Sequence, residues 1–281
     1  MNDALAQAAA WINRPANALG RFLLAPIAYL PGWLSATIVA GVTGVLLLVA
    51  YKYTSNQRAI KRARAGIKAN LLALKLFKDS PLVAMRAQGA ILGGAARLLV
   101  LSIVPMLVMA VPVILVLAQL SLWYQARPLD VGEEALLTVR LRADDTKPIS
   151  AVQLRPTDAV KVLIGPVRVE SERAVCWTIR AAQDGNHRLT LIVGDQPVEK
   201  ELCIGGGPMR LSSQRPGWRW SDILLYPAER PLDASSPIDS IEIAYPATSS
   251  WTSGTDWWVI YWILASMIAA FALRAPLNIH I

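Results

Sequence analysis

Three long apolar runs stand out in this chain of 281 residues. The first falls within the 30 uncharged residues 22–51, the second within the 29 uncharged residues 98–126, and the third is the 17-residue stretch 257–273. About 20 apolar residues are needed to cross the hydrocarbon core of a bilayer, whereas apolar runs of about 10 to 14 residues are typical of buried soluble helices. The pattern therefore predicts transmembrane helices over 33–51, 98–126 and 257–274, the last near the lower length limit.

Between the first two runs, apolar residues recur at the spacing of a helix. Ile60 and Ile67 belong to one apolar stripe, and basic residues occupy the remaining positions. Ser80 is a good N-cap residue and Pro81 suits the first position of a helix, so a second helix is expected to begin there. The pattern predicts an antiparallel helical hairpin over 52–97.

After residue 131 the apolar pattern alternates with a period of two. A further alternating strand is expected at 238–246, and the stretch 205–237, rich in Pro and Trp, is expected to be irregular. Together these features predict an all-β immunoglobulin-like sandwich domain over 128–250. The other alternating runs are TVRLRA, AVQLRP, VKVLIG, VRVESE, VCWTIRA, HRLTLIVG and VEKELCIG.

The chain has two cysteines, both in the predicted β domain. If Trp177 points into the core, alternation places Cys176 on the outward face of the same strand. Cys203 shares a face with Glu199 and Glu201 and should also point outward. A core disulfide of immunoglobulin type is therefore disfavoured, although whether the two thiols are bonded stays open.

The segment before the first span is apolar but interrupted by proline. Pro26 and Pro31 should break one continuous helix, and Trp11 carries an amphipathic ring suited to headgroup depth. We expect residues 1–32 to form an amphipathic segment on the outer face of the membrane. A cleavable signal peptide is not predicted, because no short apolar core follows the first basic residues.

The distribution of basic residues predicts the orientation. The segment 52–97 contains ten bases and the single acid Asp79, whereas residues 128–250 contain 14 bases and 17 acids. By the positive-inside rule the hairpin and the tail 275–281 should be cytoplasmic, with the N-terminus and the β domain outside. We expect the plasma (inner) membrane as the location. The net charge of +8 is then a property of the hairpin, and it favours anionic lipid over specific nucleic acid as a partner.

No constellation of catalytic or metal-binding residues is recognisable. The two histidines, His187 and His280, lack cysteine or carboxylate neighbours at metal-ligand spacing, and Gly205 to Gly207 do not lead into a phosphate-binding helix. We therefore expect no metal site, no cofactor and no enzymatic activity.

Polar side chains within the predicted spans form the remaining candidate site. Small hydroxyl groups commonly serve ordinary helix packing, and the alternative is that they line a wet groove for a client segment. The groove candidates are Thr37, Thr43, Ser102, Gln119 and Ser266. The cytoplasmic bases expected to contact clients or lipid are Arg58, Lys61, Arg62, Arg64, Lys68 and Arg97.

The order of these parts resembles the YidC/Oxa/Alb membrane insertase superfamily, particularly its small three-span branch with archaeal homologues and a subunit of the endoplasmic reticulum membrane complex. Residues 22–127 and 256–281 follow that plan. The local sequence features that are similar to this family are YKYTSNQRAIKRAR after the first span, Gln88 in the hairpin, Pro105 in LLVLSIVPML, and the aromatic-rich last span.

The resemblance implies an insertase or insertase-like chaperone, which passes client helices through a polar groove in a thinned bilayer. Many insertases carry a base within the first core span, and this span has none between Trp33 and Tyr51, so Lys52 or Arg97 would have to serve from the rim. The implied partners are membrane lipids, hydrophobic client segments, and the ribosome or anionic lipid at the hairpin. The competing hypothesis is an envelope assembly or sensor subunit that binds a protein partner through its external β domain.

Overall fold

The chain forms two compact units in a computed structural model. One unit comprises residues 1–36 and 114–261, and we call it the β unit. The other comprises residues 37–113 and 262–281, and we call it the helical unit. The structure describes residues 2–25, 30–77, 80–142, 152–194, 196–206, 209–248 and 257–277.

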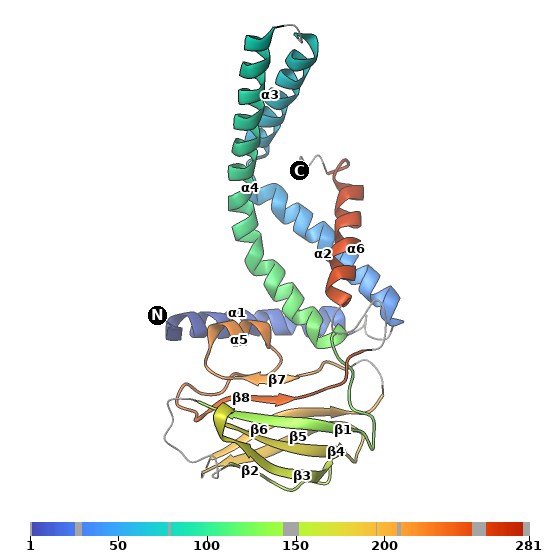
Figure 1. The fold of residues 1–281 in the computed structure, drawn as a ribbon. Helices are drawn as coiled ribbons and strands as arrows, with labels where there is room; N and C mark the ends of the chain where they lie inside the picture. Colours follow the sequence, from blue (N-terminus) through green and yellow to red (C-terminus); the bar gives the residue numbers. More distant parts are fainter. Residues whose placement is uncertain are drawn as a thin grey trace. The chain divides into compact units, whose positions relative to one another are not determined.

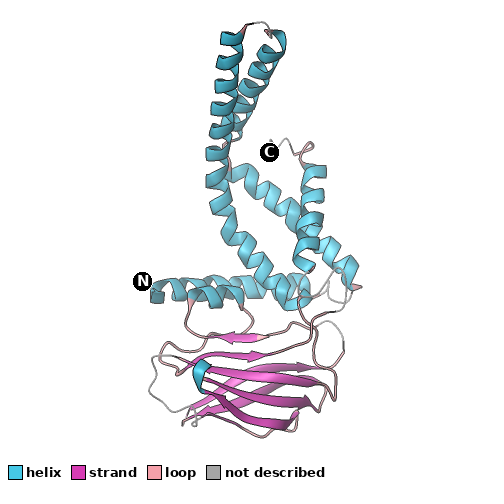
Figure 2. Cartoon of the chain, viewed as in Figure 1, coloured by secondary structure: helices cyan, strands magenta, loops and turns pink. Residues whose placement is uncertain are grey.

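The β unit contains two antiparallel sheets (Figures 1 and 2). The five-stranded sheet has the order β3-β4-β1-β8-β7, and the three-stranded sheet has the order β2-β5-β6. The strands are β1 (Glu134–Leu141), β2 (Val152–Leu154), β3 (Val160–Val169), β4 (Ala174–Ala181), β5 (Gly185–Val193), β6 (Gln196–Ile204), β7 (Gln214–Pro216) and β8 (Ile238–Ile243).

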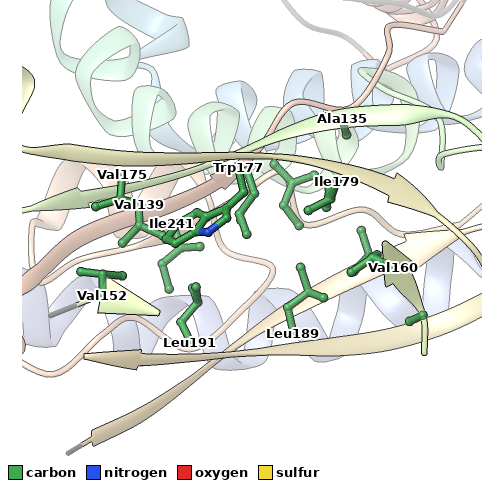
Figure 3. Close-up of a cluster of buried hydrophobic side chains, with 14 of the residues drawn as sticks. Ala135, Val139, Val152, Val160, Val175, Trp177, Ile179, Leu189, Leu191 and Ile241 are labelled. Atoms are coloured by element: carbon green, nitrogen blue, oxygen red, sulfur yellow. The ribbon is translucent and has the colours of Figure 1, made fainter. Parts of the chain in front are cut away.

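Both sheets contribute to one hydrophobic core, which Figure 3 shows around Trp177. Trp177 and Ile179 of β4 face inward from the larger sheet, and Leu189 and Leu191 of β5 face inward from the smaller one. Alternate residues of β4 are buried while Arg180 is exposed, which is the pattern predicted for a strand with one face on a core. The expectation of a two-sheet β domain is confirmed by this arrangement.

The strand order is not that of an immunoglobulin domain. In the immunoglobulin constant fold the first strand lies at a sheet edge, whereas β1 here lies in the centre, between β4 and β8. The two runs expected as separate strands at 160–165 and 167–172 form the single strand β3, followed by a short 3-10 helix, Glu170–Glu172. Gly165 joins them with a φ of 127°, and an added Cβ there would lie 2.7 Å from the Trp177 ring.

Two helices pack together in the β unit, and the sequence pattern predicted neither their contact nor the second helix. Helix α1 (Asn2–Leu24) ends before Pro26, as expected, and buries Ala6 and Ala9 against Ile223 of helix α5 (Trp220–Leu225). The stretch 205–237 is therefore not wholly irregular, because it contains both β7 and α5. The N-terminal segment belongs to the fold of the β unit rather than standing apart from it.

The helical unit contains α3 and most of three other helices. Among the described residues, α2 and α4 are long and apolar enough to cross a membrane. Helix α6 has 16 residues and is about 24 Å long at 1.5 Å per residue, which is short of the ~30 Å hydrocarbon core. The third span therefore stays a prediction. The bounds are α2 (Gly32–Thr54), α3 (Gln57–Leu76), α4 (Pro81–Tyr124) and α6 (Trp258–Leu273).

The second helix of the predicted hairpin and the second predicted span are one continuous helix, α4. Pro105 and Pro112 lie inside it and do not end it. The hairpin begins at Asn56, later than the predicted start at residue 52, because α2 continues to Thr54. Asn56 caps α3 by accepting a hydrogen bond from the Ala59 amide at 3.1 Å.

Candidate functional site

The predicted basic hairpin is formed by α3 and the first half of α4 (Figure 1). Ile60 and Ala63 are buried on α3, and a Cβ added to Gly94 of α4 would lie 2.7 Å from the Cγ1 atom of Ile67. The predicted apolar stripe of α3 thus contacts α4, and glycine allows the close approach.

The six bases that the sequence singled out all lie on the exposed surface of the helical unit. Each is exposed, and none forms an ion pair with a residue that the structure describes. Among the described residues the positive charge of these six bases is uncompensated, as a surface for anionic partners requires. These residues are Arg58, Lys61, Arg62, Arg64, Lys68 and Arg97.

The hairpin also exposes large apolar side chains near its turn, which the sequence analysis did not identify as a site. Leu76 is 74% exposed at the end of α3, and Met85 is 73% exposed at the start of α4. We call Leu71, Leu72, Leu76, Phe77, Leu82 and Met85 the apolar tip. The signal in the sequence was that Leu72 and Leu76 fall outside the stripe of Ile60 and Ile67. A group of large exposed apolar side chains, unlike a single one, suggests protein or membrane contact.

Helix α4 exposes apolar side chains over much of its length within the helical unit. The 18-residue window that qualifies it as a candidate span is only 6% buried. A helix of this composition without protein cover suits contact with lipid or with another apolar helix. The exposed residues include Leu99, Val100, Ile103, Val104, Met106, Leu107, Val108 and Val111.

Helices α2 and α6 meet at a close contact in the helical unit. The Nε1 atom of Trp262 donates to the Oγ1 atom of Thr43 at 2.9 Å. A Cβ added to Gly44 would lie 2.8 Å from the Cα atom of Ser266, so the two backbones are in contact there. Small residues at such a point let two helices approach closely, as in membrane helix pairs.

The structure brings together two of the five predicted groove residues and separates the rest. Thr43 and Ser266 lie at the α2–α6 contact, where Ser266 donates to the Ile263 carbonyl at 2.9 Å. Thr37 is exposed on α2, and Ser102 is exposed on α4, where it donates to the Leu98 carbonyl at 2.8 Å.

Gln119, the fifth groove candidate, belongs to the β unit. Its Nε2 atom donates to the Oδ1 atom of Asn17 in α1 at 2.8 Å, and the residue is only 7% exposed. Its amide therefore serves the packing of α4 on α1.

A depression of about 510 Å³ between α2 and α6 is lined by apolar residues, among them Ile38, Val42, Leu46 and Ala269.

Lys52, a predicted rim base, is engaged at the end of α2. Its Nζ atom donates to the Leu277 carbonyl just after α6, at 2.9 Å. This hydrogen bond ties the segment after α6 to the end of α2. The other base expected at the rim of the groove, Arg97, is exposed.

The β unit contains a buried pairing of serine and lysine that a search for chemistry has to consider. The Nζ atom of Lys200 lies 3.1 Å from the Oγ atom of Ser212, and burial lowers the pKa of Lys200. A neutral lysine beside a serine can act as a general base. Here Lys200 is fully buried and bound to Glu229, and Ser212 is 2% exposed, so the cluster gives a substrate no access and is structural.

No family model, curated protein or solved structure matches this chain. The resemblance to insertases therefore stays a prediction from the sequence.

Proposed function

We propose that this protein is a membrane insertase or insertase-like chaperone that receives hydrophobic client segments at the apolar tip of its hairpin. In this proposal α2, α4 and α6 span the plasma membrane, the hairpin and C-terminus are cytoplasmic, and the β domain lies outside. The observation that carries it is the exposed apolar tip at the end of a hairpin whose six exposed bases form no ion pair with a described residue. The positive-inside rule accounts for the bases, whereas membrane embedding alone would not require the exposed apolar tip.

The physical logic follows the two surfaces of the hairpin. Exposed leucines and methionine offer a client helix an adaptable apolar surface, because methionine is flexible and polarisable. The bases attract anionic headgroups or the ribosome, and so hold the tip near membrane and nascent chain. The exposed face of α4 then offers a path along which a client can exchange tip contacts for lipid.

A polar groove is the finer part of the proposal. Thr37 and Ser102 are exposed on α2 and α4, and we assign them to the client path. Thr43, Ser266 and Gln119 take part in helix packing, so we assign them to holding the helices in place. Polar groups that reach partway into the bilayer lower the cost of moving polar client flanks through hydrocarbon.

Photocrosslinking to nascent chains tests the proposal directly. A photoreactive amino acid at Leu76 or Met85 should capture a ribosome-bound chain with an exposed hydrophobic segment, and not the same chain with that segment made polar. The matched control is the photoreactive residue at Leu136, an exposed apolar position in β1. Equal capture at Leu136, or no capture at the tip, would overturn the proposal.

Reconstitution gives the second test. Proteoliposomes with the purified protein should protect a short-tailed client from protease. Leu72→Gln with Leu76→Gln should reduce this protection at least about fivefold, because each leucine that the client covers contributes about 1.5 to 3 kcal/mol to binding. The control Leu136→Gln should leave insertion unchanged. Insertion that is independent of the protein would refute the assignment.

An external partner of the β domain is the second candidate function, and one observation favours it. Strand β3 is an edge of the larger sheet, is ten residues long, and exposes Val162, Leu163, Ile164 and Val167. A long apolar edge strand can pair with a strand of another protein. A partner that copurifies with the protein and is lost in Ile164→Lys, while nascent chains are still captured at the tip, would support this role.

A further inference from the structure

Helix α1 has three distinct faces. Ala6, Ala9 and Asn13 lie on its buried face, toward α5. A second face exposes Leu5, Ile12, Leu19 and Leu23, which recur at spacings of seven and four residues. A third face, on the other side of the buried face from these leucines, carries Gln7, Arg14 and Arg21.

The third face lines a cavity of about 690 Å³ in the β unit, between α1 and the segment 218–231. Arg14 and Arg21 line it from α1, and Arg230 lines it from the segment after α5. Trp11 also lines the cavity, and the guanidinium of Arg14 lies over its ring at 5.1 Å. Three arginines in the lining of one cavity favour a ligand with negative charge.

The acid in the lining does not cancel this charge. Glu229 lines the cavity, but its Oε1 atom is 2.5 Å from the Nζ atom of Lys200. Behind the wall, Arg210 donates to the Oδ1 atom of Asn17 at 3.0 Å. Burial, together with the positive charge of Arg21, lowers the pKa of Arg210 to about 10. An anion in the cavity would relieve this repulsion between two arginines.

One residue of the cavity lining has a buried polar atom without a partner among the described residues. Asn13 lines the cavity and is 5% exposed, and its Nδ2 atom donates to the Ile223 carbonyl at 2.5 Å. Its Oδ1 atom is buried without a hydrogen-bond partner among the described residues. Buried polar atoms are nearly always partnered in native proteins, so a donor is expected here.

We infer that this cavity binds the headgroup of an anionic phospholipid, with the phosphate held by Arg14, Arg21 and Arg230. The exposed apolar side chains on the cavity side of α1 select lipid over a soluble phosphate. Trp11 and Phe22 share a face with Ala18, and Trp11 and Ala18 both line the cavity. Trp11 is 64% exposed and Phe22 is 80% exposed, so acyl chains can cover both rings, and the amphipathic ring of Trp11 suits the bilayer interface. This site is separate from the hairpin and does not depend on insertase activity.

Fluorine NMR of the full-length protein, labelled with 5-fluorotryptophan in a neutral detergent, can test this site locally. The resonances of Trp11 and Trp218, both in the cavity lining, are assigned with Trp11→Phe and Trp218→Phe. Dioctanoyl phosphatidylglycerol should shift both resonances saturably. Dioctanoyl phosphatidylcholine should bind at least about fivefold more weakly, because its choline cation faces three arginines and each charge near such a surface contributes about 1 kcal/mol.

The variants distinguish a specific binding site from non-specific electrostatic attraction of the anionic lipid to the protein. Arg14→Gln with Arg21→Gln should weaken the phosphatidylglycerol response at least about tenfold. The control, Lys161→Gln with Arg168→Gln, removes two exposed charges from β3 and should change nothing. Should the α1 variant fail to fold, Arg230→Gln tests the opposite wall and should weaken the response about fivefold.

Three results would overturn the inference. The first is an equal response to the two lipids, and the second is an unchanged response in the arginine variants. The third is saturation by inorganic phosphate at the concentration that suffices for phosphatidylglycerol, which would identify a site for free phosphate instead of a lipid.

Discussion

The Nζ atom of Lys200 lies 2.5 Å from the Oε1 atom of Glu229, and both side chains are buried in the β unit. Lys200 also donates to the Ser212 carbonyl at 2.5 Å, and Glu229 accepts a hydrogen bond from the Glu201 amide at 3.0 Å. The pair therefore joins β6 to the segment that leads into and out of α5. Since that segment forms one wall of the arginine-lined cavity, the ion pair also fixes the shape of the proposed lipid site.

Breaking this pair on one side should strongly destabilise the β domain. Glu229→Gln leaves the Lys200 ammonium buried without a countercharge, at a cost of about 3 to 5 kcal/mol. Urea unfolding of the full-length protein in detergent, followed by the β-sheet circular dichroism signal, measures this loss.

A neighbouring exposed pair supplies the control. Arg188 and Glu199 lie 3.2 Å apart with side chains 68% and 58% exposed, so Glu199→Gln should change the free energy of unfolding by less than about 1 kcal/mol. Similar losses in Glu199→Gln and Glu229→Gln would show that Lys200 does not depend on its buried partner.

The Cys203 thiol should make the stability of the β domain fall at alkaline pH. Burial raises the pKa of Cys203 from 9.0 to about 11. Between these values the folded state keeps a proton that the unfolded state has lost, so this contribution is complete below about pH 9 and disappears as the pH rises toward 11. By pH 10 the loss is about 1.4 kcal/mol, one pKa unit. Cys203→Ala should lack this part of the pH dependence.

The measurement compares the free energies of unfolding of the two proteins at pH 8 and pH 10. Burial also raises the pKa of Tyr245, whose hydroxyl accepts a hydrogen bond from the Cys203 amide at 3.0 Å. That residue is present in both proteins, so the difference between them isolates the thiol. Parallel pH profiles would refute the assignment.

Alternation predicted the inward face of each long strand but not what covers the outward face. The sequence placed Cys203 outward, together with Glu199 and Glu201, and the direction is correct. The thiol is nevertheless buried, because the segment carrying Arg210 crosses over it and the Arg210 carbonyl lies 3.8 Å from its Sγ atom. Both cysteines are free in the structure. The same alternation puts Lys200 on the face of Leu202. The sequence analysis did not use this sign of a buried charge, and alternation alone could not identify Glu229 as its partner.

Local sequence patterns likewise predicted the long helices but not the contacts between segments that are distant in the sequence. Apolar length predicted α2 and α4, and the turn at Ser80 predicted the start of α4. The contact of α1 with α5 was not predictable, because it is made by Ala6 and Ala9, which give no apolar periodicity. Likewise, the five polar groove candidates were chosen by position in a span, and only the fold decides that Gln119 lies in a different unit from Thr43.

Close packing of α2 on α6 should be sensitive to side-chain volume at Gly44. Gly44→Val would place carbon atoms against the backbone of Ser266 and force the helices apart, at a cost of about 1 to 3 kcal/mol. Gly41 is the matched control, since nothing lies within 4 Å of a Cβ added there. Gly41→Ala should instead stabilise α2 by about 0.5 to 1 kcal/mol. Thermal unfolding of the helices in detergent measures both, and equal stability of the two variants would contradict the contact.

The hydrogen bond from Trp262 to Thr43 should contribute a small, measurable coupling between α6 and α2. Trp262→Phe and Thr43→Val each remove one partner, and in a double-mutant cycle their interaction should be about 0.6 kcal/mol, the average for hydrogen bonds between membrane helices. Ser266→Ala is the comparison, because the hydroxyl of Ser266 donates to the Ile263 carbonyl within α6 itself. Its coupling to Thr43→Val should be smaller than that of Trp262→Phe.

If Thr43 instead lined a wet groove, water would replace the lost partner and the Trp262–Thr43 coupling would vanish, while client insertion by Thr43→Val would fall. A coupling near 0.6 kcal/mol with unchanged insertion therefore assigns Thr43 to packing and leaves the groove to Thr37 and Ser102.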